Sequence, residues 1–303
     1  MSLASWGLLF TLSVIWGGSF LFAKVAVAEI PPVTLAFLRV AIACAALHLV
    51  LRVTGQRFPR DVKTLAAFTV MGLLNNAIPF SLLFWGQAQI AAGLASILNA
   101  TTPIFTFVIA ALWLGQETPA WHRVAGVAVG FSGVALMLSA SLAGMSSAPI
   151  LAQVACLGAA FSYGLAAAFA KTFKKTPPMV SAAGQLTGST AILFIPALFF
   201  GGSWSPAATG ALVWMNVLAL GLGATALAYL IYFRLLATAG ATNASLVTLL
   251  IPASAILLGF FFLGERLEPA QLGGLGILLL GLVLLDGRVL ARLRTPRADR
   301  RTG

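Results

Sequence analysis

Apolar residues form long stretches along this chain, and short polar or charged segments separate them. A window of about 19 residues matches the length of a helix that crosses the hydrocarbon core of a bilayer. With that window the sequence predicts ten membrane-spanning helices, near residues 5–27, 33–52, 65–85, 93–114, 121–140, 150–171, 179–200, 210–236, 242–263 and 270–287. The first apolar run follows no basic segment, so we expect a span there and not a cleaved signal peptide.

The pattern repeats. The segment from Gly93 to Glu117 returns as Thr242 to Arg266 at a constant offset of 149 residues. The matching pairs are Ala95/Ala244, Ser96/Ser245, Leu98/Val247, Pro103/Pro252, Leu114/Leu263 and Gly115/Gly264. Each half then holds five spans, and because five is odd the second copy enters the membrane upside down. We therefore expect an all-α membrane protein of two inverted five-helix repeats around a central cavity, with repeats at 1–145 and 146–287 and a basic tail at 288–303.

The distribution of basic residues predicts the orientation. If the N-terminus is cytoplasmic, fifteen of the 18 Lys and Arg residues fall on the cytoplasmic side, and only Lys24, Arg39 and Arg266 fall outside. The positive-inside rule then places both termini in the cytoplasm. This explains the net charge of +11 without a nucleic acid partner, which remains the alternative for the basic tail.

Composition points to lipid as the solvent. Only 8% of the residues are charged and 60% are hydrophobic, whereas a soluble chain carries about 25% charged residues. The two cysteines, Cys44 and Cys156, lie in apolar spans and are interpreted as small buried hydrophobic residues.

The middle of the predicted spans contains no carboxylate or histidine that could act in catalysis or bind a coupling ion. All seven carboxylates lie near span ends, and His48 and His122 are expected at the membrane interfaces. The sequence has no HExxH motif and no cluster of metal ligands. We therefore expect no enzyme, no cofactor and no metal, and a carrier that is uncoupled or weakly coupled to ions.

Uncharged polar and aromatic residues do occur at mid-span, where they are costly in lipid. For any one of them, a hydrogen bond to a neighbouring helix is an equally good explanation. As a cluster they predict the wall of a substrate-binding cavity, formed by Trp16, Ser19, Asn75, Asn76, Ser96, Asn99, Tyr163, Gln185, Tyr229, Tyr232, Ser245 and Thr248. Pro103 and Pro252, at matched places in the two halves, are predicted hinges.

Two cationic side chains near the outer ends of their spans, Lys24 and Arg39, have two interpretations. The favoured one is that they extend to the membrane interface, and the alternative is a gate or an anchor for a carboxylate.

Small residues are expected where helices touch. Gly126, Gly130 and Gly133 in one span and Gly273, Gly274 and Gly276 in another allow close helix approach within the scaffold. A dimer interface is the alternative use, and we expect a functional monomer.

Several motifs together resemble one transporter family. The WGGSFLFAK segment, the FLR of Phe37–Arg39, the LNATTPIFT segment and the IPASAILLGFFFLGER segment resemble the EamA-type members of the drug/metabolite transporter superfamily. The resemblance extends over nearly the whole chain and implies ten helices in inverted repeats and export of small metabolites from the bacterial cytoplasm. The second half departs from the pattern, since Gln185 stands near the place that corresponds to Arg39.

We therefore expect a multi-pass protein of the bacterial inner membrane that exports small metabolites by alternating access. Its expected substrates are aromatic or small neutral amino acids, as the resemblance implies. Efflux of drugs or lipophilic cations is the alternative, and a channel, an enzyme and a structural membrane protein are further ones.

Overall fold

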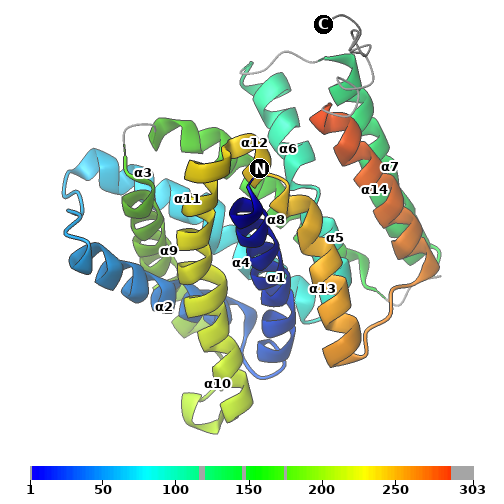
Figure 1. Ribbon diagram of the computed structural model, residues 1–303. Coiled ribbons are helices and arrows are strands. Elements are labelled where there is room, and N and C mark those ends of the chain that lie inside the picture. Colours follow the sequence, from blue (N-terminus) through cyan, green and yellow to red (C-terminus); the bar gives the residue numbers. More distant parts are fainter. Residues whose placement is uncertain (1, 116–119, 145–147, 174–175, 288–303) are drawn as a thin grey trace, which may run out of the picture.

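Figure 1 shows the computed structural model of the chain. It describes residues 2–115, 120–144, 148–173 and 176–287. Throughout this part of the chain the secondary structure consists of helices, joined by short turns and loops.

The first half contains seven α-helices. Its elements are α1 (Leu3–Ala26), α2 (Pro32–Val53), α3 (Val62–Gly72), the π-helical turn η1 (Leu73–Ala77), α4 (Ile78–Gln87), α5 (Ala92–Asn99), α6 (Thr102–Val108), the π-helical turn η2 (Ile109–Trp113) and α7 (Trp121–Leu142). Because α3, η1 and α4 follow one another without a break, they form a single membrane-length helix, Val62–Gln87.

The second half follows the same plan. Its elements are α8 (Ile150–Phe169), the 3₁₀ turn η3 (Ala170–Phe173), α9 (Pro178–Phe200), the 3₁₀ turn η4 (Pro206–Ala208), α10 (Ala211–Leu218), the π-helical segment η5 (Ala219–Leu227), α11 (Ala228–Ala239), α12 (Ala241–Ala244), α13 (Val247–Leu263) and α14 (Pro269–Asp286). Here α10, η5 and α11 join into one long helix, Ala211–Ala239.

In the described residues, nine helices are long and apolar enough to cross a membrane, and Val247–Leu263 is a shorter apolar tenth. The sequence-based prediction of an all-α membrane protein is therefore confirmed. Most predicted span edges lie within three residues of the observed ones, because local signals fix them. Proline begins α2, α9 and α14, where its missing N–H has no partner to lose, and the Asp61 carboxylate accepts the Thr64 N–H at the start of α3.

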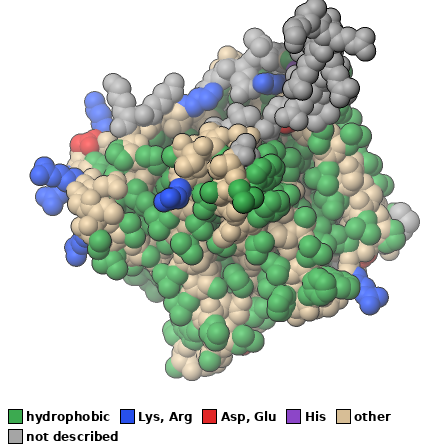
Figure 2. Space-filling view, viewed as in Figure 1, with side chains coloured by type: hydrophobic (Ala, Val, Ile, Leu, Met, Phe, Trp, Pro, Cys, Tyr) green, Lys and Arg blue, Asp and Glu red, His purple; other side chains and the backbone are tan. Residues whose placement is uncertain are grey.

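The outer surface of the bundle suits lipid. Large apolar side chains are exposed along the spans, and in the run at the end of α9 the side chains of Leu198, Phe199 and Phe200 are 66–80% exposed. Figure 2 shows apolar side chains spread over this face of the molecule, with Lys and Arg mostly at its margins. A soluble protein rarely exposes so large an apolar area.

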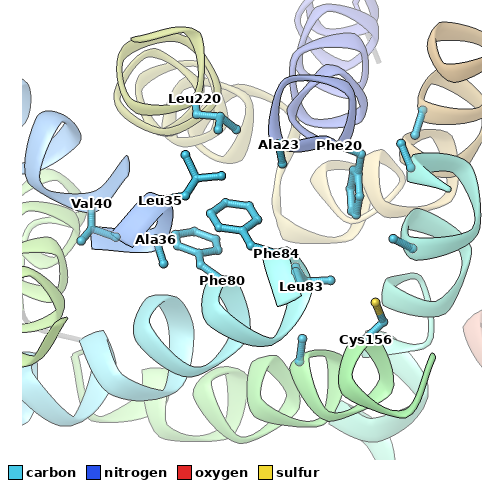
Figure 3. Packing of buried hydrophobic residues seen from close by; sticks show 14 of the residues in the cluster. Phe20, Ala23, Leu35, Ala36, Val40, Phe80, Leu83, Phe84, Cys156 and Leu220 are labelled. Carbon is cyan, nitrogen blue, oxygen red and sulfur yellow. The ribbon is translucent and has the colours of Figure 1, made fainter. Parts of the chain in front are cut away.

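The core is formed where α1, α2, α4 and the second half meet. In Figure 3 the rings of Phe80 and Phe84 on α4 lie between Leu35 of α2 and Phe20 of α1. These four side chains are at most 6% exposed. They fill one end of the space between the two halves.

Helices α7 and α14 pack side by side along their length (Figure 1). A Cβ atom added at Gly133 would lie 2.6 Å from the Gly274 carbonyl oxygen, so the two backbones are in direct contact. Gly126 has an equally close approach to Gly281 and Leu285. The prediction of glycine-mediated helix contact is thus confirmed within the chain, although the residues on α14 differ in part from the predicted ones. Gly274 belongs to the contact, whereas Gly276 has open space beside it and Gly273 meets only a Leu136 methyl group at 3.5 Å.

The two prolines that were predicted as matched hinges differ in their surroundings. The span with Pro103 breaks just before it, between α5 and α6, whereas Pro252 lies inside the continuous helix α13. The break in that span comes earlier, at Ser245 and Leu246. The two spans thus break at different distances before the matched prolines, and the hinge role of Pro103 and Pro252 stays a prediction.

The matched irregularities are π-helical. Adding the repeat offset of 149 to η1 (73–77) gives 222–226, which lies within η5 at Ala219–Leu227. A π turn inserts one extra residue into the helix and frees a carbonyl group, and such turns are frequent at functional sites. The carbonyl of Leu74 in η1 is bonded by the Ser162 hydroxyl at 2.7 Å.

Candidate functional site: a one-sided central cavity

A cavity of about 430 Å³ lies between the two halves. Its wall is contributed by residues of α1, α2, α3, η1, α4, α5 and α6 from the first half and of α8, η5, α11, α12 and α13 from the second. The wall combines aromatic rings with amide and hydroxyl groups, the mixture that is typical of a small-molecule site.

Ten of the twelve predicted cavity residues line this space. They are Trp16, Ser19, Asn75, Ser96, Asn99, Tyr163, Tyr229, Tyr232, Ser245 and Thr248. Pro103 lies in the wall as well, which places the break before it at the cavity. Polar or aromatic residues at mid-span were thus a good guide to the wall.

Asn76 and Gln185 do not line the cavity. Asn76 is fully buried, and neither its amide nitrogen nor its carbonyl oxygen has a hydrogen-bond partner in the described chain. Gln185 lies behind the wall, where its Oε1 accepts a hydrogen bond from Asn75 Nδ2 at 2.7 Å. Asn75 Nδ2 also donates to the hydroxyl of Tyr229 at 3.4 Å. Gln185 therefore positions wall residues and is not itself part of the wall.

Asn99 is different, since its Oδ1 is buried at the cavity and has no hydrogen-bond partner among the described residues. An unsatisfied buried acceptor costs about 1–3 kcal/mol. Asn99 ends α5, next to the break before Pro103, which brings its side chain to the wall.

Arg39 also lines the cavity, and it is only 6% exposed. The expectation that it extends to the membrane interface was wrong, because the guanidinium lies over the ring of Phe80, 3.9 Å from the ring centroid. Its Nε donates to Thr225 Oγ1 at 2.9 Å, and Thr225 in turn donates to the Leu220 carbonyl oxygen within η5. The π-helical segment thus provides the group that fixes Arg39.

Lys24 likewise turns inward. Its Nζ donates to the carbonyl oxygens of Gln87 and Ile90, at 2.7 and 2.9 Å, where α4 ends. Gln87 Nε2 donates to the Phe20 carbonyl oxygen at 2.8 Å. These bonds join α1 to the end of α4, so Lys24 binds protein carbonyls at the end of the membrane-length helix Val62–Gln87.

The cavity is closed at that end and open at the other. Near Lys24 the lining residues Phe20, Phe84 and Gln87 are at most 5% exposed. The lining residues Ala167 and Ser245 are exposed. Ala167 lies near the end of α8, and Ser245 directly follows α12, which lies close to the beginning of α1 (Figure 1). The mouth of the cavity is therefore at the end of the bundle where α1 begins.

Five of the seven carboxylates fall within the described residues, and none of these five lines the cavity. Glu29 accepts the Gly210 N–H ahead of α10, and Glu265 accepts the N–H groups of Ala92 and Gly93 at the start of α5. Negative charge at a helix N-terminus is stabilising, which explains both positions. Glu117 and Asp299 are outside the described residues. His48 bonds Thr187 of α9 at 2.9 Å, and neither histidine is among the lining residues.

One sequence feature would have identified Arg39 as a site residue. It is the sole charged residue within the apolar run from Val33 to Val50, and an ionisable group inside a span is a functional candidate by default. Its position seven residues after the start of α2 was interpreted as the end of a span instead. Gln87 and Thr225 gave no such signal, because single polar residues near span ends are common.

The model of the EamA-like transporter family matches this chain twice, at residues 5–139 and 150–285. The chain belongs to the EamA-like transporter family. The two matches correspond to the two halves of the fold, and together they cover nearly all of its helices. The protein is thus a multi-pass membrane transporter, as the sequence motifs indicated.

Curated relatives of this EamA-like transporter agree with the family match. A probable terminal-alkyne amino-acid exporter of Streptantibioticus cattleyicolor is 30% identical over 97% of each chain. An inner membrane transporter of Escherichia coli K12, YedA, is 26% identical over 92% of this chain and 89% of its own. A solved crystal structure has a TM-score of 0.67 at 20% identity, covering 97% of this chain and all of its own, and it supports the fold alone.

Proposed function

We propose that this EamA-like transporter exports amino acids or closely related small metabolites across the bacterial inner membrane. The observation that carries the proposal is the cavity, which is open at one end, closed at the other and lined by aromatic rings beside amide groups. Its volume, about 430 Å³, is near the lower end for ligand pockets and suits a metabolite better than a large drug. The relative from Streptantibioticus cattleyicolor, described as an amino-acid exporter, supports the same substrate class.

The proposed direction follows from the orientation. If the positive-inside rule holds, the beginning of α1 is cytoplasmic, and the mouth of the cavity then faces the cytoplasm. The contacts of Lys24 and Gln87 would in that case close the outer side. An exporter loads its substrate in this arrangement and releases it after the closed end opens.

The proposed mechanism is alternating access without strong ion coupling. In the described residues no carboxylate or histidine lines the cavity, so the wall contains no group that titrates near neutral pH. The same property disfavours the alternative, efflux of lipophilic cations, because the charged group in the described wall is a cation, Arg39.

Transport by purified protein in liposomes tests the proposal. The liposomes are loaded with a panel of labelled amino acids, sugars and cationic dyes, with and without a pH gradient. We expect saturable amino-acid flux that does not depend on the gradient and that falls in Asn99→Ala and Trp16→Ala. The matched controls are Asn216→Ala and Trp6→Ala, which remove the same side chains from outside the cavity wall, where Asn216 is half-buried and Trp6 is exposed. Flux of dyes alone, driven by the pH gradient, would contradict both the substrate class and the mechanism.

A further inference from the structure

Arg39 is a buried cation without an acidic partner. It is 6% exposed, and among the described residues no carboxylate oxygen lies within ion-pair distance of its guanidinium. An arginine inside a membrane-spanning helix is costly, and a buried charge normally has a paired anion. Among the described residues Arg39 makes one side-chain hydrogen bond, in which its Nε donates to Thr225 Oγ1. The N–H groups on its two Nη atoms have no hydrogen-bond acceptor among these residues.

The surroundings hold the guanidinium towards the cavity. One face lies on the ring of Phe80, with the Phe84 ring centroid 5.9 Å away. Thr225 fixes the Nε edge, because its own hydroxyl hydrogen is used in the bond to the Leu220 carbonyl. A guanidinium that is fixed along one face and one edge presents its Nη atoms in a defined direction. Such a fork binds a carboxylate through two parallel hydrogen bonds.

The position of Arg39 within the cavity also matters. It lies at the closed end, beside the buried lining residues Phe80 and Phe84, whereas the polar residues Ser245 and Thr248 lie towards the mouth. Asn99 lines the same cavity. A ligand that enters from the mouth with its carboxylate first can reach Arg39 at the closed end.

We propose that Arg39 is the carboxylate-binding residue of the cavity, so that the transporter selects substrates that carry a free carboxylate and rejects the corresponding amides and amines. This inference rests on the proposed function and specifies its substrate class. Thr225 is a positioning residue that acts through Arg39. The second half offers no equivalent cation, since its corresponding residue, Gln185, is bonded to Asn75.

Binding measurements with three ligands of one aromatic body test this inference. Phenylalanine has both charged groups, 3-phenylpropionate has the carboxylate alone, and phenylalaninamide has the ammonium alone. For the wild-type protein we expect binding of phenylalaninamide to be at least about tenfold weaker than that of phenylalanine, the loss that one charge-assisted hydrogen-bond pair produces.

Variants of Arg39 and Thr225 distinguish a role of Arg39 in carboxylate binding from a role in folding. In Arg39→Gln we expect the affinities for phenylalanine and 3-phenylpropionate to fall about tenfold or more, with little change for phenylalaninamide. Arg39→Lys keeps the charge and should keep part of the preference, and Thr225→Val should weaken both carboxylate ligands less than Arg39→Gln does. The matched control is Arg234→Gln, since Arg234 is exposed on α11. If Arg39→Gln does not fold, the lysine and valine variants provide the test.

The possible results distinguish the two proposals. The carboxylate-binding role of Arg39 is contradicted if the preference for acids over amides persists unchanged in Thr225→Val and in all the Arg39 variants that fold. Equal binding of acid and amide by the wild type overturns it as well. Binding of 3-phenylpropionate without phenylalanine contradicts the amino-acid proposal and still supports the carboxylate-binding role of Arg39.

Discussion

The contact between α7 and α14 makes a sharp prediction about stability. A Cβ atom at Gly133 would lie 2.6 Å from the Gly274 carbonyl oxygen and 2.8 Å from the Leu278 nitrogen. Ordinary contact begins at 3.4 Å, so the helices must separate by about 0.8 Å (3.4 minus 2.6) in Gly133→Ala. Both neighbours are backbone atoms of a regular helix and cannot rotate away. Overpacking of this kind costs about 1–3 kcal/mol.

Gly276→Ala on α14 is the matched control, because nothing lies within 4 Å of its added Cβ atom. In a helix alanine is favoured over glycine by about 0.8–1 kcal/mol, so this variant should be neutral or slightly stabilised. The two identical substitutions therefore have opposite expected signs. In Gly133→Ala the same preference for alanine offsets part of the overpacking cost, which leaves a net loss of up to about 2 kcal/mol. We therefore expect its unfolding midpoint in detergent to fall by up to about 6 °C, at roughly 2–3 °C per kcal/mol for a chain of this size.

The assay is thermal unfolding of purified protein at a fixed scan rate, read by tryptophan fluorescence or by loss of the monodisperse fraction. The fixed rate matters because membrane proteins often unfold irreversibly. If Gly133→Ala and Gly276→Ala shift the midpoint together, the close contact between α7 and α14 is refuted as a source of stability.

Three further predictions concern other parts of the chain. In Lys24→Met the closed end of the cavity should loosen, because the Gln87 and Ile90 carbonyls lose their donor. A cysteine placed at Ser96 should then react faster with a maleimide added on the side of the membrane where α4 ends, and an unchanged rate would argue that the Lys24 hydrogen bonds do not close this end. In Ser162→Ala the Leu74 carbonyl in η1 is left unpaired, which we expect to lower the free energy of unfolding by about 0.6–2 kcal/mol, whereas Ser139→Ala, at an exposed position that bonds its own helix, should change it little. The hydrogen bond from the Thr64 N–H lowers the pKa of Asp61 below its ordinary 3.8. The ionised carboxylate therefore stabilises the fold above pH 3.8, and this stability is lost as the pH falls through the lowered pKa. The difference in unfolding midpoint between wild type and Asp61→Ala should be full at neutral pH and vanish in strong acid, and a difference that does not change with pH would contradict the capping role of Asp61.

The spans were predictable because lipid leaves few choices. A chain that must satisfy its backbone without water forms helices, and their length is set by the bilayer, so an apolar window finds them. Most of the cavity wall was predictable for a related reason, since polar groups such as Asn75 and Asn99 are too costly to face lipid. The same reasoning could not separate the wall from the layer behind it. Asn76 and Gln185 are as polar as their neighbours, and only the helix rotation shows that they point elsewhere.

Arg39 was misplaced because a long cationic side chain within eight residues of a helix end normally extends to the membrane interface. In the structure Lys24 binds the carbonyls at the end of α4, and Arg39 lies on Phe80. The η1 and η5 turns were also missed, because a π turn has no fixed sequence signal comparable to that of proline.

The duplication supplies a symmetric frame for an asymmetric site. Arg39 on α2 bonds Thr225 in η5, and its counterpart Gln185 on α9 bonds Asn75 in η1. Each half thus sends a polar side chain from its second span to the π turn of the other half's third span. Since the paired turns lie at the repeat offset, a common ancestor with two equal bonds explains both contacts. One of the two positions now carries a cation that lines the cavity, and the other an amide behind the wall. The charge difference between these positions makes the closed end of the cavity cationic, and substitution at Arg39 is therefore expected to change selectivity more than substitution at Gln185.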